Sequence, residues 1–132
     1  MTEAAAPRFA THLGLHEALE VRRALCLRFG GDPEPTDPGL LEAALLRPRS
    51  GHYRTLSEQA AALLHGLATQ RPFRSDNLRF AFALTVVFLR LNHHNVRVAP
   101  REAAHFMREQ VCARGADVPR IARALERVLV AF

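Results

Sequence analysis

The chain contains no lysine, and it has only two cysteines among its 132 residues. Cys26 and Cys112 stand alone, without a C-x-x-C spacing, so the sequence indicates neither a disulfide framework nor a zinc site. A chain of this length buries about two thirds of its unfolded surface and needs no covalent or metal cross-link to fold. We therefore expect a single domain over residues 1–132 and a cytoplasmic location.

Long hydrophobic runs are also missing. The longest uncharged apolar segment, residues 80–89, is far shorter than the roughly 20 residues that span a bilayer. Residues 1–7 carry no hydrophobic core of a signal peptide. Hydrophobic residues make up 48% of the chain and charged residues 23%, which is typical of globular proteins. We therefore expect a soluble protein with no membrane partner.

Because lysine is absent, all eighteen basic residues are arginine, and the formal net charge is +5. They are spread from Arg8 to Arg127, with no block longer than Arg22-Arg23. A positive field speeds encounter with any anionic partner and does not choose between RNA, DNA and nucleotides. We favour a solvated basic surface over a dedicated nucleic-acid interface, which stays open as an alternative. A stripe on the last helix fits a solvated or partner-facing surface: Arg120, Arg123 and Arg127.

The spacing of the apolar residues is helical almost throughout. Between Thr11 and Phe29 they keep three- and four-residue steps, and Gly30-Gly31 supplies the stop. Capping residues and prolines predict further helices over residues 38–46 (N-cap Asp37), 55–69 (capping box Thr55–Glu58), 77–91, 100–114, and from Asp117 through Leu129. The fold class is therefore all-α, a compact bundle of about six helices with no sheet beyond a short extended piece at residues 96–98.

The segment from Asn77 to Leu91 is apolar nearly all round, which predicts a helix buried at the centre of the fold. A short polar loop ending at Asp76 precedes it, because Pro72 interrupts the preceding helix. The unpaired backbone N–H groups at a helix N-terminus favour anions, and arginines surround this one: Arg71, Arg74 and Arg79. The alternative is that Ser75 or Asp76 merely caps the helix and that the arginines are solvated.

The segment QRPFRSDNLR, from Gln70 to Arg79, resembles the active-site loop of the Fic/Doc (Fido) family. That loop reads H-P-F-x-D-G-N-K-R in Doc-like members and ends G-N-G-R in many Fic adenylyltransferases. Other segments are similar to Doc, the death-on-curing toxins, in order and at family spacing: 15–17, 29–31, 37–45 with 47–48, 64–68 and 87–92. Together they cover about residues 15–98. The resemblance implies a Doc-like Fido domain, all-helical, with a nucleotide site at this loop.

The resemblance also implies an activity, the transfer of AMP or phosphate from ATP to a protein hydroxyl. Pro72, Phe73, Asn77 and Arg79 match the family loop. By resemblance, Phe73 anchors the loop in the core and Asn77 orients phosphate oxygens. Arg79, by the same resemblance, holds the far phosphate of the nucleotide.

Four loop positions depart from the family pattern. Arg71 stands where the family has its general-base histidine, and an arginine stays protonated and cannot accept a proton. Loss of a general base alone costs about 10²–10⁴ in rate. Ser75 replaces the acidic Mg²⁺ ligand, Asp76 replaces a glycine, and Leu78 replaces a lysine or glycine. ATP or another nucleotide is thus the implied ligand, whereas Mg²⁺ is not expected unless the loop is rebuilt so that Asp76 recovers the ligand role.

Other histidines are candidates for the missing general base or for a metal site. His16 and His65 lie in segments that pack near the loop in family members, so either is a candidate substitute base. The simpler interpretation is a helix histidine hydrogen-bonded in or near the core. The pair His93-His94 has no acidic or third histidine partner near it in sequence, so we expect no metal site.

Three functions follow, in order of preference. The first is a degenerate Doc-like pseudoenzyme that keeps an anion or nucleotide pocket and acts through protein binding in a toxin–antitoxin-like context. The second is an active ATP-dependent AMP- or phosphotransferase with rearranged chemistry, and the third is a basic nucleic-acid-binding helical module. By resemblance the partner is a small antitoxin. Since the chain has no [S/T]-x-x-x-E-[G/N] inhibitory helix of its own, such regulation would come in trans.

Overall fold

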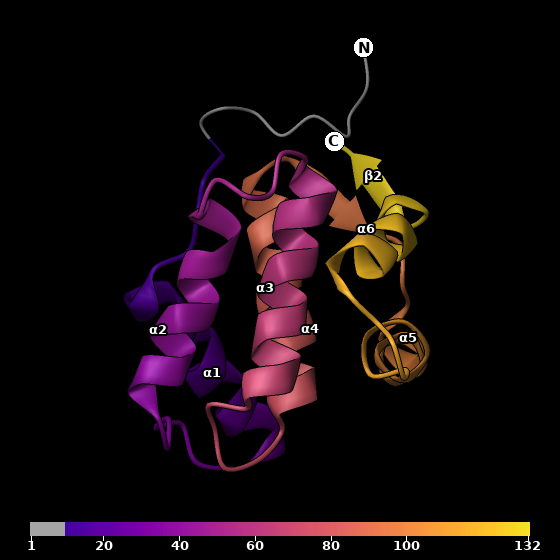
Figure 1. Cartoon of the computed structure of the whole chain (residues 1–132). Helices are drawn as coiled ribbons and strands as arrows, with labels where there is room; N and C mark the ends of the chain where they lie inside the picture. The colour runs from indigo at the N-terminus through magenta and orange to yellow at the C-terminus, as the bar shows by residue number, and fades with distance from the viewer. Residues whose placement is uncertain (1–9) are drawn as a thin grey trace.

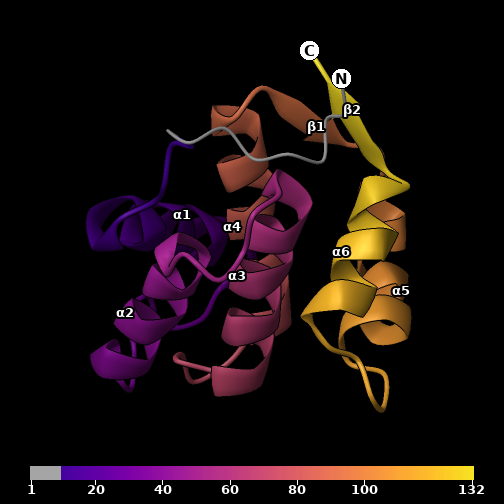
Figure 2. The ribbon, with the colours of Figure 1, turned by 45° about the horizontal axis from the view of Figure 1, so that its top comes forward.

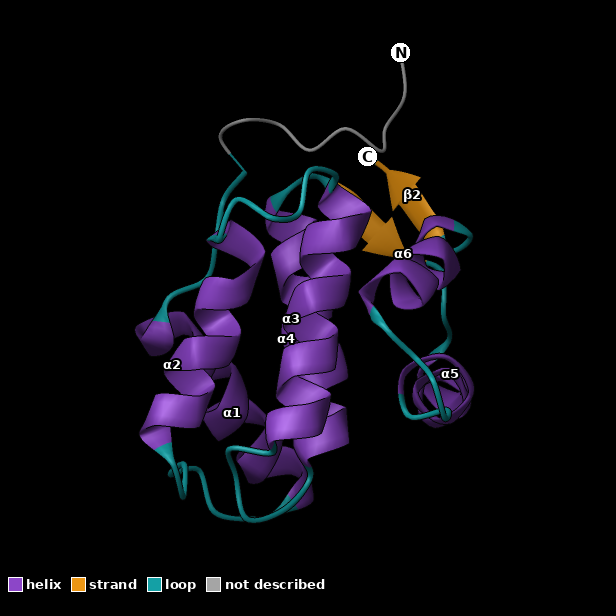
Figure 3. Cartoon of the chain, viewed as in Figure 1, coloured by secondary structure: helices purple, strands orange, loops and turns teal. Residues whose placement is uncertain are grey.

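Helices dominate the computed structural model, which describes residues 10–132 (Figures 1 and 3). The described part holds six α-helices: α1 (Leu15–Phe29), α2 (Pro38–Leu46), α3 (Leu56–Gln70), α4 (Asn77–Leu91), α5 (Ala103–Phe106) and α6 (Val118–Glu126). Two three-residue strands, β1 (His94–Val96) and β2 (Leu129–Ala131), form a small antiparallel sheet. The predicted all-α fold class is confirmed.

The antiparallel pair α3 and α4 forms the middle of the bundle. Helices α1 and α2 lie on one side of it and α5 and α6 on the other, as Figures 1 and 2 show. Eleven of the fifteen residues of α3 are buried, against seven of fifteen in α4. The run of alanines at residues 60–62 lets neighbouring helices approach α3 closely, since all three are fully buried.

Helix α4 is buried on one face, although its sequence, apolar nearly all round, predicts burial on every side. Phe80, Leu84 and Phe88 are at most 1% exposed. Phe82 and Val86 are half-buried on the other side, where Phe82 meets the ring of Phe106 edge-on. The helix is therefore a core element, and α3 is more completely enclosed than α4 is.

Helix α1 begins at Leu15, four residues after the predicted start at Thr11. Residues 10–14 form no helix, because Thr11 exchanges two hydrogen bonds with Asn92 at the far end of α4. The Thr11 N–H donates to Asn92 Oδ1 at 2.9 Å, and Asn92 Nδ2 donates to the Thr11 carbonyl at 2.9 Å. His12 stacks on Phe88, with ring centroids 5.7 Å apart. These contacts join segments about 80 residues apart, which local periodicity does not reveal.

Three predicted helix starts are confirmed by their caps. Asp37 accepts a hydrogen bond from the Leu40 N–H, and Asp117 accepts one from the Arg120 N–H. Thr55 and Glu58 form the reciprocal capping box at the start of α3. At these points the sequence pattern and the structure agree to within a residue.

The prediction of one continuous helix over residues 100–114 is wrong. It is divided into a 3-10 turn (Pro100–Glu102), the short α5 and a π-helical turn (Met107–Val111). Only Met107 and Val111 of this stretch are buried. Two buried side chains give too little apolar contact to hold the whole stretch in one regular helix.

The final helix ends at Glu126, short of the predicted end at Leu129. Residues 129–131 form β2 and pair with β1, so that His94 faces Ala131 in the register. Hydrogen bonds flank the ladder, from the Arg97 N–H to the Val128 carbonyl and from the Phe132 N–H to the His93 carbonyl. The extended segment predicted at residues 96–98 is shifted to 94–96 because pairing with β2, rather than local alternation, defines the strand.

No helix within residues 10–132 is both long enough and apolar enough to cross a bilayer.

Two partly buried histidines give the fold a dependence on pH. Burial, and secondarily the Arg49 guanidinium, lower the pKa of His12 below its ordinary value of 6.5. Burial, and secondarily the Arg47 guanidinium, also lower the pKa of His65, and Asp117 opposes them with a smaller effect. The unfolded chain therefore takes up protons near pH 6.5 that the folded chain resists. Stability is fully present above that pH and falls as the pH drops below it.

We expect the melting temperature to fall between pH 7.5 and pH 5, and we expect His12→Gln to flatten this dependence because it removes one of the two groups. Thermal denaturation followed by circular dichroism measures both. His105→Gln, at an exposed position on α5, is the matched control and should keep the wild-type slope. A His12→Gln profile parallel to the wild type would contradict the assignment.

Candidate functional site

The loop between α3 and α4 lies at the same end of the bundle as the loop between α1 and α2 (Figure 1). Two non-glycine residues in the left-handed region bound it, Arg71 with φ 50° and Asp76 with φ 58°. An L-residue pays about 1–2 kcal/mol for this conformation, somewhat less for Asp. The loop must therefore be fixed by contacts strong enough to outweigh that cost.

Asn77 supplies the central contact. Its Nδ2 donates to the Phe73 carbonyl at 2.8 Å, and its Oδ1 accepts from the Phe73 N–H at 3.0 Å. Asn77 is 8% exposed and Phe73 is 3% exposed, so both hydrogen bonds are shielded from water. The amide oxygen and one amide hydrogen of Asn77 are thus used in shaping the loop.

Two further contacts, made by Phe73 and Pro72, fix the loop to the rest of the protein. The ring of Phe73 packs edge-on against Phe80, with centroids 4.8 Å apart. The Pro72 carbonyl accepts hydrogen bonds from the Thr36 N–H at 2.8 Å and from Thr36 Oγ1 at 3.1 Å. The preceding loop, between α1 and α2, thus holds this one in place.

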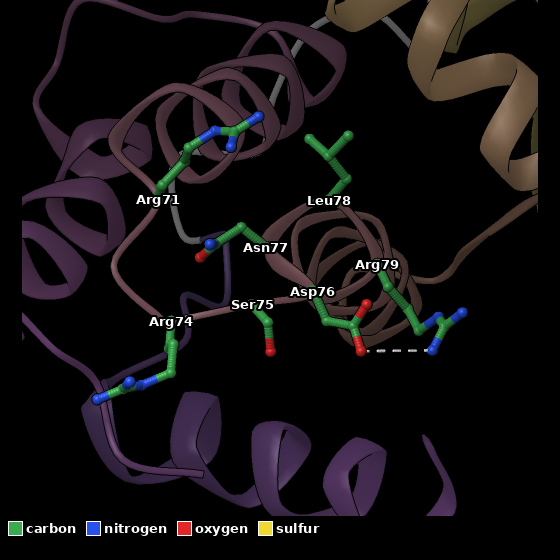
Figure 4. A pocket seen from close by; sticks show the side chains of 7 residues that line it. All are labelled: Arg71, Arg74, Ser75, Asp76, Asn77, Leu78 and Arg79. Carbon is green, nitrogen blue, oxygen red and sulfur yellow. Dashed lines mark ion pairs between the residues drawn. The ribbon is translucent and has the colours of Figure 1, made fainter. Parts of the chain in front are cut away.

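Above these anchors the structure forms a hollow of about 300 Å³ (Figure 4). Three arginines and one aspartate line it, which gives a net charge of +2. In Figure 4, Arg71 and Leu78 project to one side of the loop, whereas Arg74, Ser75 and Asp76 project to the other. The lining residues are those that the sequence singled out: Arg71, Arg74, Ser75, Asp76, Asn77, Leu78 and Arg79.

The N-terminus of α4 opens into this hollow without a cap. Asp76 is in the N-cap position, but its side chain makes no capping hydrogen bond. The first bond of the helix runs from the Phe80 N–H to the Asp76 carbonyl. Within residues 10–132, the N–H groups of residues 77–79 are therefore left for solvent or a ligand. The alternative of a simple side-chain cap by Ser75 or Asp76 is not what the structure shows.

Asp76 instead pairs with Arg79. The carboxylate Oδ2 lies 3.5 Å from Arg79 Nη1, and both side chains are a little under half exposed (Figure 4). The Arg79 guanidinium also lies over the ring of Phe29, 3.8 Å from its centroid. An arginine in the first turn of a helix opposes the helix dipole. Here the compensating negative group comes from the chain itself.

The apolar spacing between Thr11 and Phe29 did not reveal one residue of this region, Arg22 of α1. Its side chain is only 1% exposed, whereas Phe29 is 47% exposed. The Arg22 Nε and Nη2 atoms donate to the Asp32 carbonyl at 3.1 and 2.8 Å. The one available signal was the four-residue spacing that places Arg22 on the same helical face as the buried Ala18.

Neither histidine considered as a substitute base lines the hollow. His65 Nδ1 lies 3.2 Å from Arg47 Nη1 and accepts its hydrogen, so the ring is bound to the residue that follows α2. His16 is 78% exposed on α1, with Nε2 3.8 Å from a carboxylate oxygen of Glu20. The structure therefore brings no imidazole to the position that Arg71 occupies.

The loop does not fit a Mg²⁺ ion. Ser75 offers a neutral hydroxyl in place of a carboxylate, and the carboxylate of Asp76 is turned toward Arg79. Mg²⁺ prefers carboxylate oxygens in near-ideal octahedral geometry. Elsewhere in the described residues, no group of three or more His, Cys, Asp or Glu side chains comes close enough to hold a metal.

Comparison with known proteins identifies the family of the chain. No protein-family model matches the chain. The chain is 33% identical over 114 residues to Toxin Doc of Mycolicibacterium smegmatis, an alignment that covers 80% of this chain and 86% of that protein. The chain belongs to the Doc toxin family. The resemblance recognised from residues 70–79 and the flanking segments is thereby confirmed at the level of the family.

We expect Asn77→Ala to destabilise the protein by about 2–3 kcal/mol, because it leaves the buried N–H and carbonyl of Phe73 without partners. Urea denaturation at pH 7 measures the change in the free energy of unfolding. Asn92→Ala removes a similarly buried amide at the other end of α4 and serves as the control for a general loss of stability. If only the Asn77 variant loses phosphate or nucleotide binding, the loop conformation is what that binding requires.

Proposed function

We propose that this Doc-family chain has lost the transfer reaction of its family and keeps a pocket for an anion or nucleotide. The observation that carries the proposal is Arg71, which is exposed at the mouth of the hollow where the family has its general base. A guanidinium cannot take a proton from a target hydroxyl. With no imidazole lining the hollow, nothing on this loop replaces it.

The pocket itself remains suited to phosphate groups. The hollow has a net charge of +2, and the uncapped N-terminus of α4 adds backbone donors and the positive end of the helix dipole. Arginine guanidinium groups bind phosphate oxygens in a bidentate manner. We infer that ATP or another nucleotide binds weakly without Mg²⁺, since Asp76 competes with it for Arg79.

We infer further that the protein acts in the cytoplasm by binding another protein. A Doc-family chain without a transferase reaction can still bind the antitoxin or the protein target of the ancestral reaction. It would then act by competing with an active toxin for that protein. A small antitoxin, supplied in trans, is the partner that fits a toxin–antitoxin context. Co-purification of this chain with the product of the neighbouring gene tests the partnership, and a neighbouring gene that encodes no small protein would count against it.

We expect ATP to bind the wild-type protein in the absence of Mg²⁺ and to bind Arg79→Ala at least about tenfold more weakly, because a charge-assisted contact to phosphate is lost. Isothermal titration calorimetry measures both affinities. Arg90→Ala, at an exposed position near the other end of α4, is the matched control and should bind as the wild type does. Absence of binding in the wild type would remove the nucleotide pocket from the proposal.

We expect no transfer of AMP or phosphate from ATP to any protein of a cell lysate above background. Arg71→His alone should restore little, since three other loop positions remain changed. The quadruple variant Arg71→His, Ser75→Asp, Asp76→Gly and Leu78→Lys should restore labelling far more than the sum of the single changes, because these residues act as a unit.

The control for this experiment is the triple variant that keeps Arg71, which should stay inactive. Labelling with radioactive ATP on its α- or γ-phosphate distinguishes AMP transfer from phosphate transfer. Robust activity of the wild-type protein would support the rearranged-enzyme alternative instead.

A further inference from the structure

Arg22 is a buried positive charge that no carboxylate of the described residues compensates. It is 1% exposed, and it forms no ion pair with any residue between 10 and 132. Its Nε and Nη2 atoms donate to one neutral acceptor, the Asp32 carbonyl, and no described residue accepts a hydrogen bond from Nη1. Burying a charge without a counter-charge is costly, so stability alone does not favour arginine at this position.

The guanidinium lies directly beneath the loop that forms the hollow. Its carbon Cζ is 4.2 Å from the centre of the Phe73 ring, the side chain that anchors the loop. A Cβ atom built on Gly31 would lie 3.5 Å from Ser75 Oγ and 3.6 Å from Arg22 Nη2, so these two atoms are no more than about 7 Å apart. Ser75 lines the hollow, and the buried charge therefore stands just behind its wall.

The charge of Arg22 acts differently from the charges of the three arginines that line the hollow. Arg71 and Arg74 are exposed and screened by salt and water, and Arg79 is paired with Asp76. Arg22 is shielded from solvent, and no carboxylate within residues 10–132 pairs with it. Its field reaches the hollow through the protein interior, where charges interact more strongly than in water.

We propose that Arg22 is a positioning residue for a phosphate-bearing ligand of the hollow. Its charge attracts the anion from behind the wall of the hollow. A bound phosphate supplies the counter-charge that the described fold does not, so ligand binding and the burial of Arg22 are coupled. This inference rests on the proposed anion or nucleotide pocket.

The test compares two substitutions of Arg22 by calorimetric titration with inorganic tripolyphosphate and with ATP. Arg22→Gln removes the charge and should weaken both ligands about tenfold. Arg22→Lys keeps the charge while losing the stacked, bidentate geometry, and should stay within about threefold of the wild type. Equal losses for tripolyphosphate and ATP locate the effect at the phosphates rather than at the base.

The matched control is Arg23→Gln, which makes the same change in net charge one residue away. Arg23 is exposed and paired with Glu20 at 2.7 Å, so its loss should leave the affinity unchanged. Equal weakening by Arg23→Gln and Arg22→Gln, or wild-type affinity in Arg22→Gln, overturns the inference. Circular dichroism establishes that each variant is folded. If Arg22→Gln does not fold, loss of binding in a folded Arg22→Lys variant overturns it.

Failure of the proposed pocket is distinguishable from failure of this inference. If the wild-type protein binds neither tripolyphosphate nor ATP, the pocket and the role of Arg22 both fall. If the wild type binds and Arg79→Ala does not, while Arg22→Gln binds as the wild type does, the pocket stands and only the role of Arg22 is refuted.

Discussion

The reciprocal pair of hydrogen bonds between Asn77 and the backbone of Phe73 is the constraint on which this site depends. It closes the loop on itself within the protein interior, where the bonds are shielded from water. Once Phe73 is fixed, its ring meets Phe80 and the guanidinium of Arg22. That arrangement holds Arg71 and Asp76 in backbone conformations that neither residue favours by itself.

The same architecture separates the scaffold of the Doc loop from its chemistry. The residues that shape the loop lie inside, whereas the changed positions Arg71, Ser75 and Asp76 lie on its exposed side. Substitution of exposed loop residues leaves the internal hydrogen bonds and the buried rings intact. The exposed positions of this loop can therefore change while the loop keeps its shape.

Much of the fold could be predicted because its signals are local. The capping residues Asp37, Thr55 and Asp117 marked three helix starts, and Pro72 marked the break before α4. The loop residues could be assigned because the family motif is contiguous over residues 70–79. The signals failed where long-range contacts decide the outcome, as in the strand that Leu129 joins by pairing with Val96 and in the non-helical Thr11 bonded to Asn92.

The sequence by itself determined that the protein is helical, where most helices begin, and which loop carries the family motif, because apolar spacing, caps and contiguous motifs act over a few residues. The tertiary structure decided what those residues face. It turned Asp76 toward Arg79 instead of toward the helix N-terminus, and it buried Arg22 behind the loop. The physical reason is that burial and pairing of charges depend on segments brought together in space, which no local pattern encodes.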